Sequence, residues 1–329
     1  LAGTDMDMVS CGFLNTLEES MAEGKVTEEQ IDAACRRVLE TKYKLGLFTD
    51  PYKYCDTLRG ENELYTTAHR AVAREIAAET FVLLKNTDNL LPLKKKGRIA
   101  LIGPMADARN NMCGMWSMTC TPSRHGTLLE GVRSAVGDEA EILYAKGSNI
   151  CYDAEQEKTA TGLRPLERGD NSQLLSEALQ TAVRADVILA ALGECAEMSG
   201  ESASRTNPMI PIVQRDLLEA LVATGKPVVL LLFTGRPLIL NWEDAHVHSI
   251  LNVWFGGSET GDAVADVLFG KKSPCGKLTT TFPRSVGQLP LYYNHLNTGR
   301  PDSDAYVFNR YASNYLDESN EPLYHFGYG

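Results

Sequence analysis

The sequence predicts an α/β fold in which a mostly parallel β-sheet is sandwiched between helices. Between residues 63 and 285, short continuous apolar runs alternate with stretches of helical periodicity. The apolar runs do not alternate with polar residues, so we expect strands that are buried on both faces. Six strands are predicted, at Ile99–Ile102, Ile142–Tyr144, Val187–Leu192, Val228–Phe233, Ile250–Phe255 and Leu278–Phe282. Helical patterns lie between most of them, near residues 127–136, 172–184, 212–223 and 261–269.

Helices are also expected before the strands begin. A first apolar series recurs at helical spacing, at Phe13, Leu17 and Met21. Thr27 and Gln30 have the spacing of a capping box and predict the start of a second helix, which Gly46 is placed to end. Residues 47–62 are expected to form a linker, and a third helix is predicted over about Thr66–Leu84.

The two ends of the chain carry weaker signals. Residues 286–329 are rich in tyrosine, asparagine, proline and glycine without clear periodicity, which predicts an extended strap that needs another surface. The chain begins at Leu1 without a start methionine, so we expect a fragment whose targeting signals are cut off.

The charge balance argues against a nucleic-acid-binding protein. Asp and Glu number 43 against 32 Lys and Arg, which gives a formal net charge of −11. Phosphate binding needs clustered Lys and Arg, and the one tight basic run, Lys94–Lys96, is expected to be a solvated turn. No apolar run approaches the roughly 20 residues that a membrane-spanning helix requires.

Several motifs for other chemistry are missing from the sequence. No G-x-G-x-x-G follows a strand, and neither G-x-x-x-x-G-K-[ST] nor G-x-S-x-G occurs. The eight cysteines form no C-x-x-C pair and no Cys/His spacing typical of zinc, so neither a metal nor an organic cofactor is expected. We expect most cysteines to be small buried side chains, although Cys113 and Cys120 are close enough in sequence to form a disulfide.

Candidate functional residues lie in the loops that follow predicted strands. Function in such sheets gathers beyond the carboxyl ends of the strands, where the long loops here are 103–126, 145–171 and 193–211. The last of these is the most polar, and it contains Glu194, Glu197, Glu201 and Arg205. A partly shielded carboxyl group at a strand end can donate a proton, but an exposed acidic turn that caps the next helix would have the same composition.

The loop around Ser199-Gly200-Glu201, with Arg205 four positions on, resembles the acid/base loop of family 3 β-glucosidases. Further segments resemble landmarks of that family in the same order: Ala2–Met8, Ala77–Asn86, Gly235–Leu238, Gly276–Leu278, Phe282–Pro290 and Pro322–Gly329. The likeness covers the whole chain and is strongest to bacterial periplasmic β-glucosidases. His325 stands where proline is common in the family.

The resemblance implies a domain organisation and a location. Residues 1–46 would be the last helical pieces of a truncated (β/α)8-type barrel, and residues 63–285 would be the family's C-terminal α/β sandwich. Residues 286–329 would lead to a fibronectin type III-like domain that is absent here. A periplasmic or secreted protein is expected.

The resemblance also implies a retaining glycosidase that uses two carboxylates. Glu201 matches the general acid/base, with Glu194 and Glu197 as alternatives. The family's nucleophile is an Asp in a Ser-Asp-Trp-type motif, which does not occur in this chain and would lie upstream of Leu1. The isolated chain is therefore expected to be inactive.

Three further residues are candidates for contact with a β-linked glucoside or oligosaccharide. Asp7 would meet substrate or hold the final turn of the barrel, and Trp116 would form a wall for a second sugar or pack between domains. Arg205 would orient its loop or touch sugar. A β-xylosidase-type activity and a non-catalytic module that binds carbohydrate or a partner domain remain alternatives.

Overall fold

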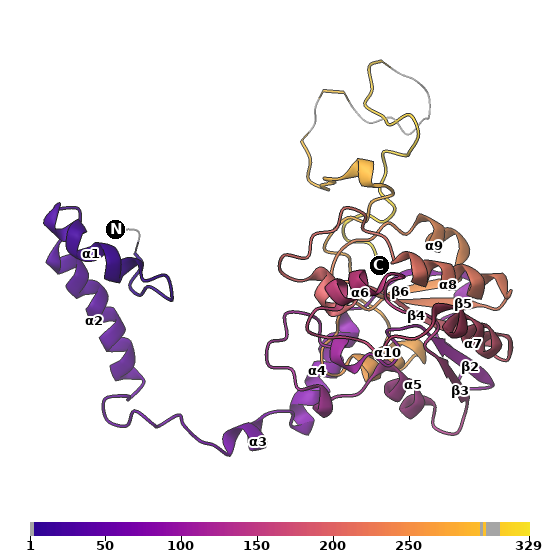
Figure 1. Ribbon diagram of the computed structural model, residues 1–329, viewed down its shortest axis with the longest axis horizontal. Coiled ribbons are helices and arrows are strands. Elements are labelled where there is room, and N and C mark those ends of the chain that lie inside the picture. The colour runs from indigo at the N-terminus through magenta and orange to yellow at the C-terminus, as the bar shows by residue number, and fades with distance from the viewer. Residues whose placement is uncertain (1–2, 297–298, 301–309) are drawn as a thin grey trace. The chain divides into compact units, whose positions relative to one another are not determined.

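The computed structural model describes residues 3–296, 299–300 and 310–329. The chain divides into two compact units, residues 1–66 and residues 67–329 (Figure 1). Within the described ranges, no helix is both long enough and apolar enough to cross a membrane.

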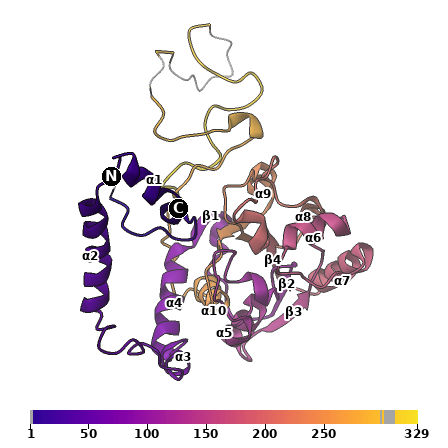
Figure 2. The same ribbon diagram turned by 60° about the vertical axis from the view of Figure 1, so that its left-hand side comes forward.

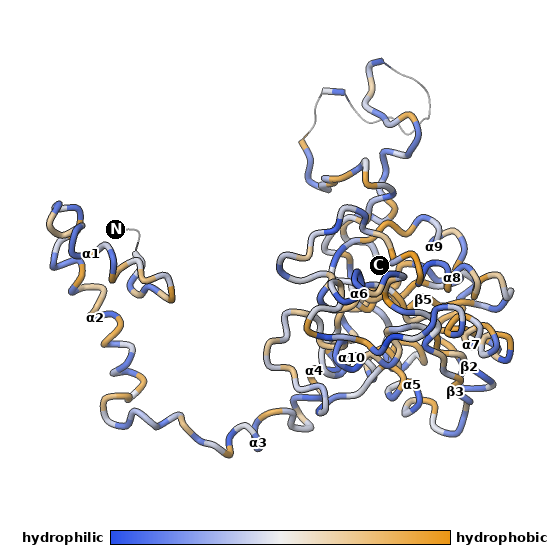
Figure 3. Tube along the Cα trace, viewed as in Figure 1, coloured by the Kyte–Doolittle hydropathy of each residue, from blue (hydrophilic) through white to orange (hydrophobic). Residues whose placement is uncertain are grey.

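The first unit contains the helices α1 (Gly12–Ala22), α2 (Glu28–Lys44) and α3 (Arg59–Glu63). The predicted capping box is present at the start of α2, where the Thr27 N–H donates to Gln30 Oε1 at 3.0 Å and the Gln30 N–H donates to Thr27 Oγ1 at 3.3 Å. No side chain of α1 or α2 is buried, and Leu39 and Tyr43 of α2 are 45% and 75% exposed. Apolar and polar segments alternate along α2 in Figure 3. The two helices thus present apolar side chains that no described residue covers.

The second unit is built around a six-stranded sheet with the order β1-β6-β5-β4-β2-β3. Its strands are β1 (Val82–Asn86), β2 (Arg98–Ile102), β3 (Glu141–Ala145), β4 (Val187–Gly193), β5 (Val228–Phe233) and β6 (Ser249–Asn252). Only β1 runs antiparallel to its neighbour, and the other pairs are parallel. The predicted α/β fold with a mostly parallel sheet is confirmed.

Helices lie before, between and after these strands. They are α4 (Thr67–Thr80), α5 (Leu128–Val136), α6 (Ala154–Thr161), α7 (Asn171–Val183), α8 (Ile212–Ala223), α9 (Asn241–His246) and α10 (Thr260–Leu268). Single 3-10 turns are η1 (Thr87–Asn89), η2 (Arg109–Asn111), η3 (Pro122–Arg124), η4 (Ala196–Ser199) and η5 (Val286–Gln288). The helices predicted between strands correspond to α5, α7, α8 and α10, whereas α6 and α9 were not predicted.

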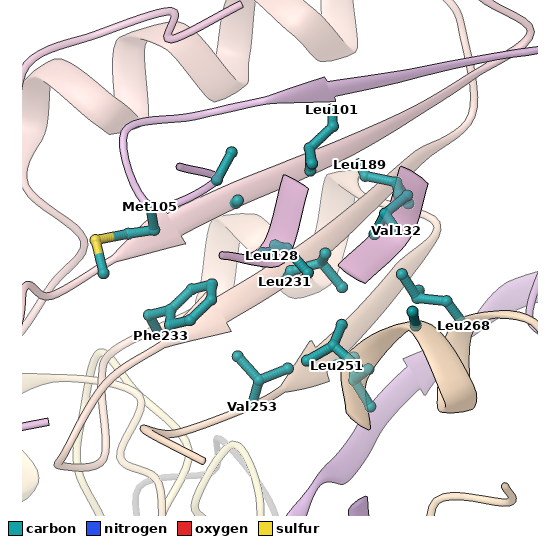
Figure 4. Close-up of a cluster of buried hydrophobic side chains, with 14 of the residues drawn as sticks. Leu101, Met105, Leu128, Val132, Leu189, Leu231, Phe233, Leu251, Val253 and Leu268 are labelled. Atoms are coloured by element: carbon teal, nitrogen blue, oxygen red, sulfur yellow. The ribbon is translucent and has the colours of Figure 1, made fainter. Parts of the chain in front are cut away.

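The sheet separates two apolar cores, one on each face. The odd-numbered residues of 228–233 in β5 enter a core shared with α4, α5 and α10, and the even-numbered residues enter a core shared with α7 and α8. Figure 2 shows these helices on opposite sides of the sheet. Figure 4 shows Leu231 and Phe233 pointing into the first core, with Leu128 of α5 and Leu268 of α10. All of β5 is buried, as expected for a strand covered on both faces.

The prediction of one helix over Thr66–Leu84 is wrong in its last turn. α4 ends at Thr80, and strand β1 follows at the edge of the sheet. Side chains of residues 81–84 enter the two cores alternately, which is the pattern of a strand. The apolar spacing of this segment fits both structures, and pairing with β6 decides for the strand.

The strand predicted over Ile250–Phe255 is too long. β6 ends at Asn252, and Trp254 takes a left-handed conformation with φ 50°, which a strand cannot contain.

The strand predicted over Leu278–Phe282 does not form. Its backbone pairs with the end of the chain instead of the sheet: the Leu278 N–H donates to Tyr328 O at 2.8 Å, and the Phe282 N–H donates to Tyr324 O at 2.9 Å. The last residues of the expected strap thus lie on this segment. Residues 297–298 and 301–309 of the strap lie outside the described residues.

The expectation that most cysteines are buried is also wrong. Cys113 and Cys120 form a disulfide. Cys151 and Cys195 are buried, while the remaining four are exposed: Cys11, Cys35, Cys55 and Cys275. Three of those four belong to the first unit, whose helices α1 and α2 have no buried side chain.

Candidate functional site

The order of the strands places the topological switch point of the sheet between β2 and β4. From β2 the chain passes to β3 on one side and then to β4 on the other, so the loops at the carboxyl ends of β2 and β4 turn in opposite directions. These are two of the three loops singled out in the sequence. They are joined where the Ala196 N–H donates to Asn111 Oδ1 at 2.9 Å, between two buried residues.

The loop after β4 begins at a position that only glycine can occupy. Gly193 has φ 130°, and a Cβ there would lie 2.0 Å from the carbonyl oxygen of Phe233 in β5. The next N–H, from Glu194, donates to the same oxygen at 2.7 Å. The backbone of Glu194, the first acidic residue of the loop, is therefore still hydrogen-bonded to the last residue of β5.

Glu194 is fully buried and held by two cations. Its Oε1 lies 2.9 Å from Arg205 Nη1 and 3.1 Å from Arg236 Nε, and its Oε2 lies 2.8 Å from the Thr234 hydroxyl. A general acid must reach the oxygen that it protonates. Glu194 reaches no solvent, and its oxygens are engaged by protein groups, so its geometry is that of an anchor.

Arg236 ties the same loop together at further points. Its Nη2 donates to the carbonyl oxygens of Met198 and Ala203, the latter at 2.6 Å. Sequence reasoning gave neither Arg236 nor Thr234 a role. The signal was available, since both residues lie within three positions of the end of β5, the neighbour of β4 in the sheet.

Glu197 is half-buried and forms an ion pair with a residue of the loop 145–171. Its Oε1 lies 3.3 Å from Arg164 Nε, and its side chain is 16% exposed. The same guanidinium donates to the carbonyl oxygens of Gly114 and Met115, the latter at 3.3 Å. Arg164 thus links all three loops, and it was missed in the sequence.

Glu201 differs from both other carboxylates of the loop. It is exposed, and its side chain makes no hydrogen bond or ion pair among residues 3–296, 299–300 and 310–329. One cleft of about 960 Å³ is lined by Glu201, Glu197 and Arg205, together with Tyr152 of the loop 145–171. Glu201 is therefore the loop carboxylate that a ligand can reach without breaking an existing contact.

Trp116 lies close to this loop and is 68% exposed. The preceding residue, Met115, packs against Gly200 so closely that a Cβ at position 200 would lie 2.4 Å from Met115 Cγ. Met115, which precedes Trp116, therefore contacts Gly200, which precedes Glu201.

Asp7 belongs to the other unit and makes local contacts there. It accepts hydrogen bonds from the Ser10 hydroxyl and from the Phe13 N–H, the latter at 3.1 Å. These hydrogen bonds lower the pKa of Asp7. Asp7 thus accepts a hydrogen bond from a backbone N–H in the first turn of α1, as a helix-capping side chain does.

Comparison with known proteins shows which family this chain belongs to. Residues 81–329 match the family described as Glycosyl hydrolase family 3 C-terminal domain. The chain is 47% identical to a periplasmic beta-glucosidase of Salmonella typhimurium, over 100% of this chain and 44% of that protein. It is 34% identical to a beta-xylosidase of Formosa agariphila, over 100% of this chain and 43% of that protein.

Solved structures agree with these relatives. The crystal structure of beta-glucosidase from Listeria innocua in complex with isofagomine superposes with a TM-score of 0.85 at 34% identity, covering 99% of this chain and 43% of that chain. The chain spans less than half the length of these relatives. It belongs to glycosyl hydrolase family 3 and contains the C-terminal domain of that family.

Proposed function

We propose that this chain is part of an enzyme that hydrolyses terminal non-reducing β-D-glucosyl residues, with Glu201 as the general acid/base. One observation carries the assignment. Of the three carboxylates in the loop after β4, Glu194 and Glu197 are engaged by arginines, whereas Glu201 is exposed and lines the cleft.

The chemistry explains why access matters. In a retaining glycosidase one carboxyl group protonates the departing oxygen and then removes a proton from water, while a second carboxylate about 5–5.5 Å away attacks the anomeric carbon. A residue in the first role exchanges its proton with substrate and with water in the same cycle. Glu201 is open to both, since it is exposed on the rim of the cleft.

We assign the nucleophile to a part of the protein outside this chain, because no Ser-Asp-Trp occurs in it. The remainder of a barrel domain would also cover the exposed apolar residues of α2, such as Leu39 and Tyr43. A fibronectin type III-like domain is a second proposed partner within the same protein. A periplasmic location is supported by the similarity to the Salmonella protein.

The choice of sugar has two candidates. Similarity to a β-glucosidase at 47% identity favours glucosides, while β-xylosidases are also among the relatives. Trp116 is proposed as an aromatic wall for the sugar beyond the cleaved bond, since aromatic faces offer a large apolar surface. Rates of the full-length protein on p-nitrophenyl β-glucoside and β-xyloside would rank the two activities.

The acid/base role is tested in the full-length protein that contains this chain. Glu201→Gln is expected to slow hydrolysis of cellobiose by about 10²–10⁴-fold, because the departing sugar needs a proton. An aryl glucoside with a good leaving group needs little protonation and should lose far less in the bond-breaking step. Azide is expected to restore turnover of such an aryl glucoside by Glu201→Ala.

Glu197→Gln is the matched control, since it removes the same charge from the same loop. It is expected to lower both rates to a similar extent. Equal loss on both substrates for Glu201→Gln, with a selective loss for Glu197→Gln, would transfer the role to Glu197.

A non-catalytic binding module is the second candidate. It is favoured by the cleft of about 960 Å³, which the second unit lines by itself. The 329-residue chain is expected to show no glucosidase turnover, and titration calorimetry with glucose and cellobiose decides whether it binds sugar unaided. Millimolar or tighter binding without turnover would support the module.

A further inference from the structure

Cys113, Cys120 and His125 form a compact cluster in the loop after β2. The two sulfur atoms lie 3.6 and 3.4 Å from His125 Nε2, and all three atoms lie within 4.8 Å of one another. His125 is 4% exposed and both cysteines are half-buried. Among the described residues this is the one group of three Cys, His or acidic side chains arranged in this way, and the proposed glycosidase chemistry does not use it.

The hydrogen bonding of His125 leaves Nε2 facing the sulfurs. Nδ1 lies 3.3 Å from the carbonyl oxygen of Gly126. A carbonyl oxygen only accepts, so Nδ1 carries a proton, and in the neutral ring Nε2 then presents a lone pair. A disulfide has no proton to donate to that lone pair. Two thiols or a metal ion would give this buried nitrogen a partner, and a carbonyl at the far nitrogen is the usual support of a metal-binding histidine.

The distances fit a tetrahedral metal site. With Zn–S near 2.3 Å and Zn–N near 2.0–2.1 Å, neighbouring sulfur and nitrogen ligands stand about 3.5 Å apart. The two S···N distances in the structure, 3.6 and 3.4 Å, lie on either side of that value. The two sulfurs would separate to about 3.8 Å. Their Cα atoms are 6.7 Å apart, which leaves room for that separation by side-chain rotation.

We propose that reduction of the Cys113–Cys120 disulfide opens a three-ligand site for a thiophilic d10 cation such as Zn²⁺. A dithiol reductant would supply two electrons and two protons, becoming a disulfide as the two cysteines become thiols. Binding of the cation to both sulfurs and to His125 Nε2 then releases two protons. A water molecule would complete the tetrahedron, as in zinc sites with three protein ligands.

The site would preserve a cross-link that matters for the neighbouring loop. The bridged segment contains Trp116, and Arg164 holds it through the carbonyl oxygen of Gly114. A disulfide closes this segment under oxidising conditions, and a metal ion would close it at the same two sulfurs under reducing conditions. The disulfide and the metal exclude each other, because each uses both sulfur atoms.

The test uses the 329-residue chain, reduced with dithiothreitol and freed of the reductant without oxygen. Titration with Co²⁺, as a spectroscopic stand-in for Zn²⁺, is expected to produce sulfur-to-cobalt charge-transfer bands and strong tetrahedral d–d bands that saturate at one equivalent. Added Zn²⁺ should abolish them. The oxidised chain should give no such bands, and reoxidation of the loaded chain should release the metal.

Matched variants separate this cluster from the other thiols and imidazoles. Cys113→Ser/Cys120→Ser is expected to abolish the bands, and His125→Ala to weaken them at least tenfold in affinity. Cys275→Ser and His295→Ala, which change exposed residues elsewhere, should leave them unaltered. The proposal is overturned if the reduced chain shows no tetrahedral cobalt spectrum, or if that spectrum survives the double serine variant. The oxidised chain supplies the same comparison without any mutation, should His125→Ala fail to fold.

Discussion

Replacement of Glu194 by glutamine tests whether this carboxylate is an anchor. Glu194→Gln keeps the size of the side chain but leaves Arg205 and Arg236 facing a neutral amide. Removing one partner of a buried ion pair costs roughly 3–5 kcal/mol. The two arginines are 19% and 22% exposed, so water can take over part of the lost interaction. We therefore expect the free energy of unfolding to fall by about 2–4 kcal/mol.

Urea unfolding followed by tryptophan fluorescence measures this loss in the right part of the chain. All three tryptophans, at positions 116, 242 and 254, belong to the second unit, so the signal reports on the unit that contains the loop. The melting temperature of that unit should fall by roughly 4–16 °C, at about 2–4 °C for each kcal/mol in a unit of this size.

Glu201→Gln is the internal control, since it makes the same chemical change in the same loop. An exposed side chain with no hydrogen bond or ion pair to the described part of the chain should change the free energy of unfolding by less than about 0.5 kcal/mol. The reasoning fails if Glu194→Gln stays within 1 kcal/mol of the unaltered chain, or if Glu201→Gln is equally damaging.

Two further predictions concern the backbone and the thiols. Gly193→Ala should lower the free energy of unfolding by more than about 2 kcal/mol, because its Cβ would overlap the carbonyl oxygen of Phe233, whereas Gly137→Ala has open space and should cost only about 1 kcal/mol; equal losses in urea unfolding would contradict this. At pH 8, iodoacetamide should modify the exposed Cys275 but not Cys195, because burial raises the pKa of the Cys195 thiol to about 12 and shields it; peptide mass spectrometry would reveal any labelling of Cys195 in the native chain.

The sequence was most informative where one physical signal dominated. A short continuous apolar run such as 228–233 is typical of a strand covered on both faces, and β5 has those bounds. Residues 81–84 were predicted as the end of a helix, although their apolar spacing suits a strand equally well. Pairing of β1 with β6 settles that segment, and this contact comes from a distant part of the chain.

The candidate site shows the same division between local and distant information. The sequence places Glu194, Glu197 and Glu201 in one strand-end loop, and the family resemblance selects the third. Which of them is buried depends on Arg236 and Arg164, which come from two other loops. The burial of Glu194 and the ion pair of Glu197 therefore depend on the assembled fold. They cannot be predicted from the sequence of the loop alone.

The anchoring of this loop has a consequence for protein engineering. Glu194 forms an ion pair with Arg205 further along the loop, and Arg236 donates hydrogen bonds to the carbonyl oxygens of Met198 and Ala203 between them. A designer who keeps these contacts, together with Gly200 and Glu201, can vary cleft-lining residues of the loop such as Ser202 and Ser204 while β4 and β5 stay as they are. Such changes would give a set of variants of one scaffold that differ only at the cleft.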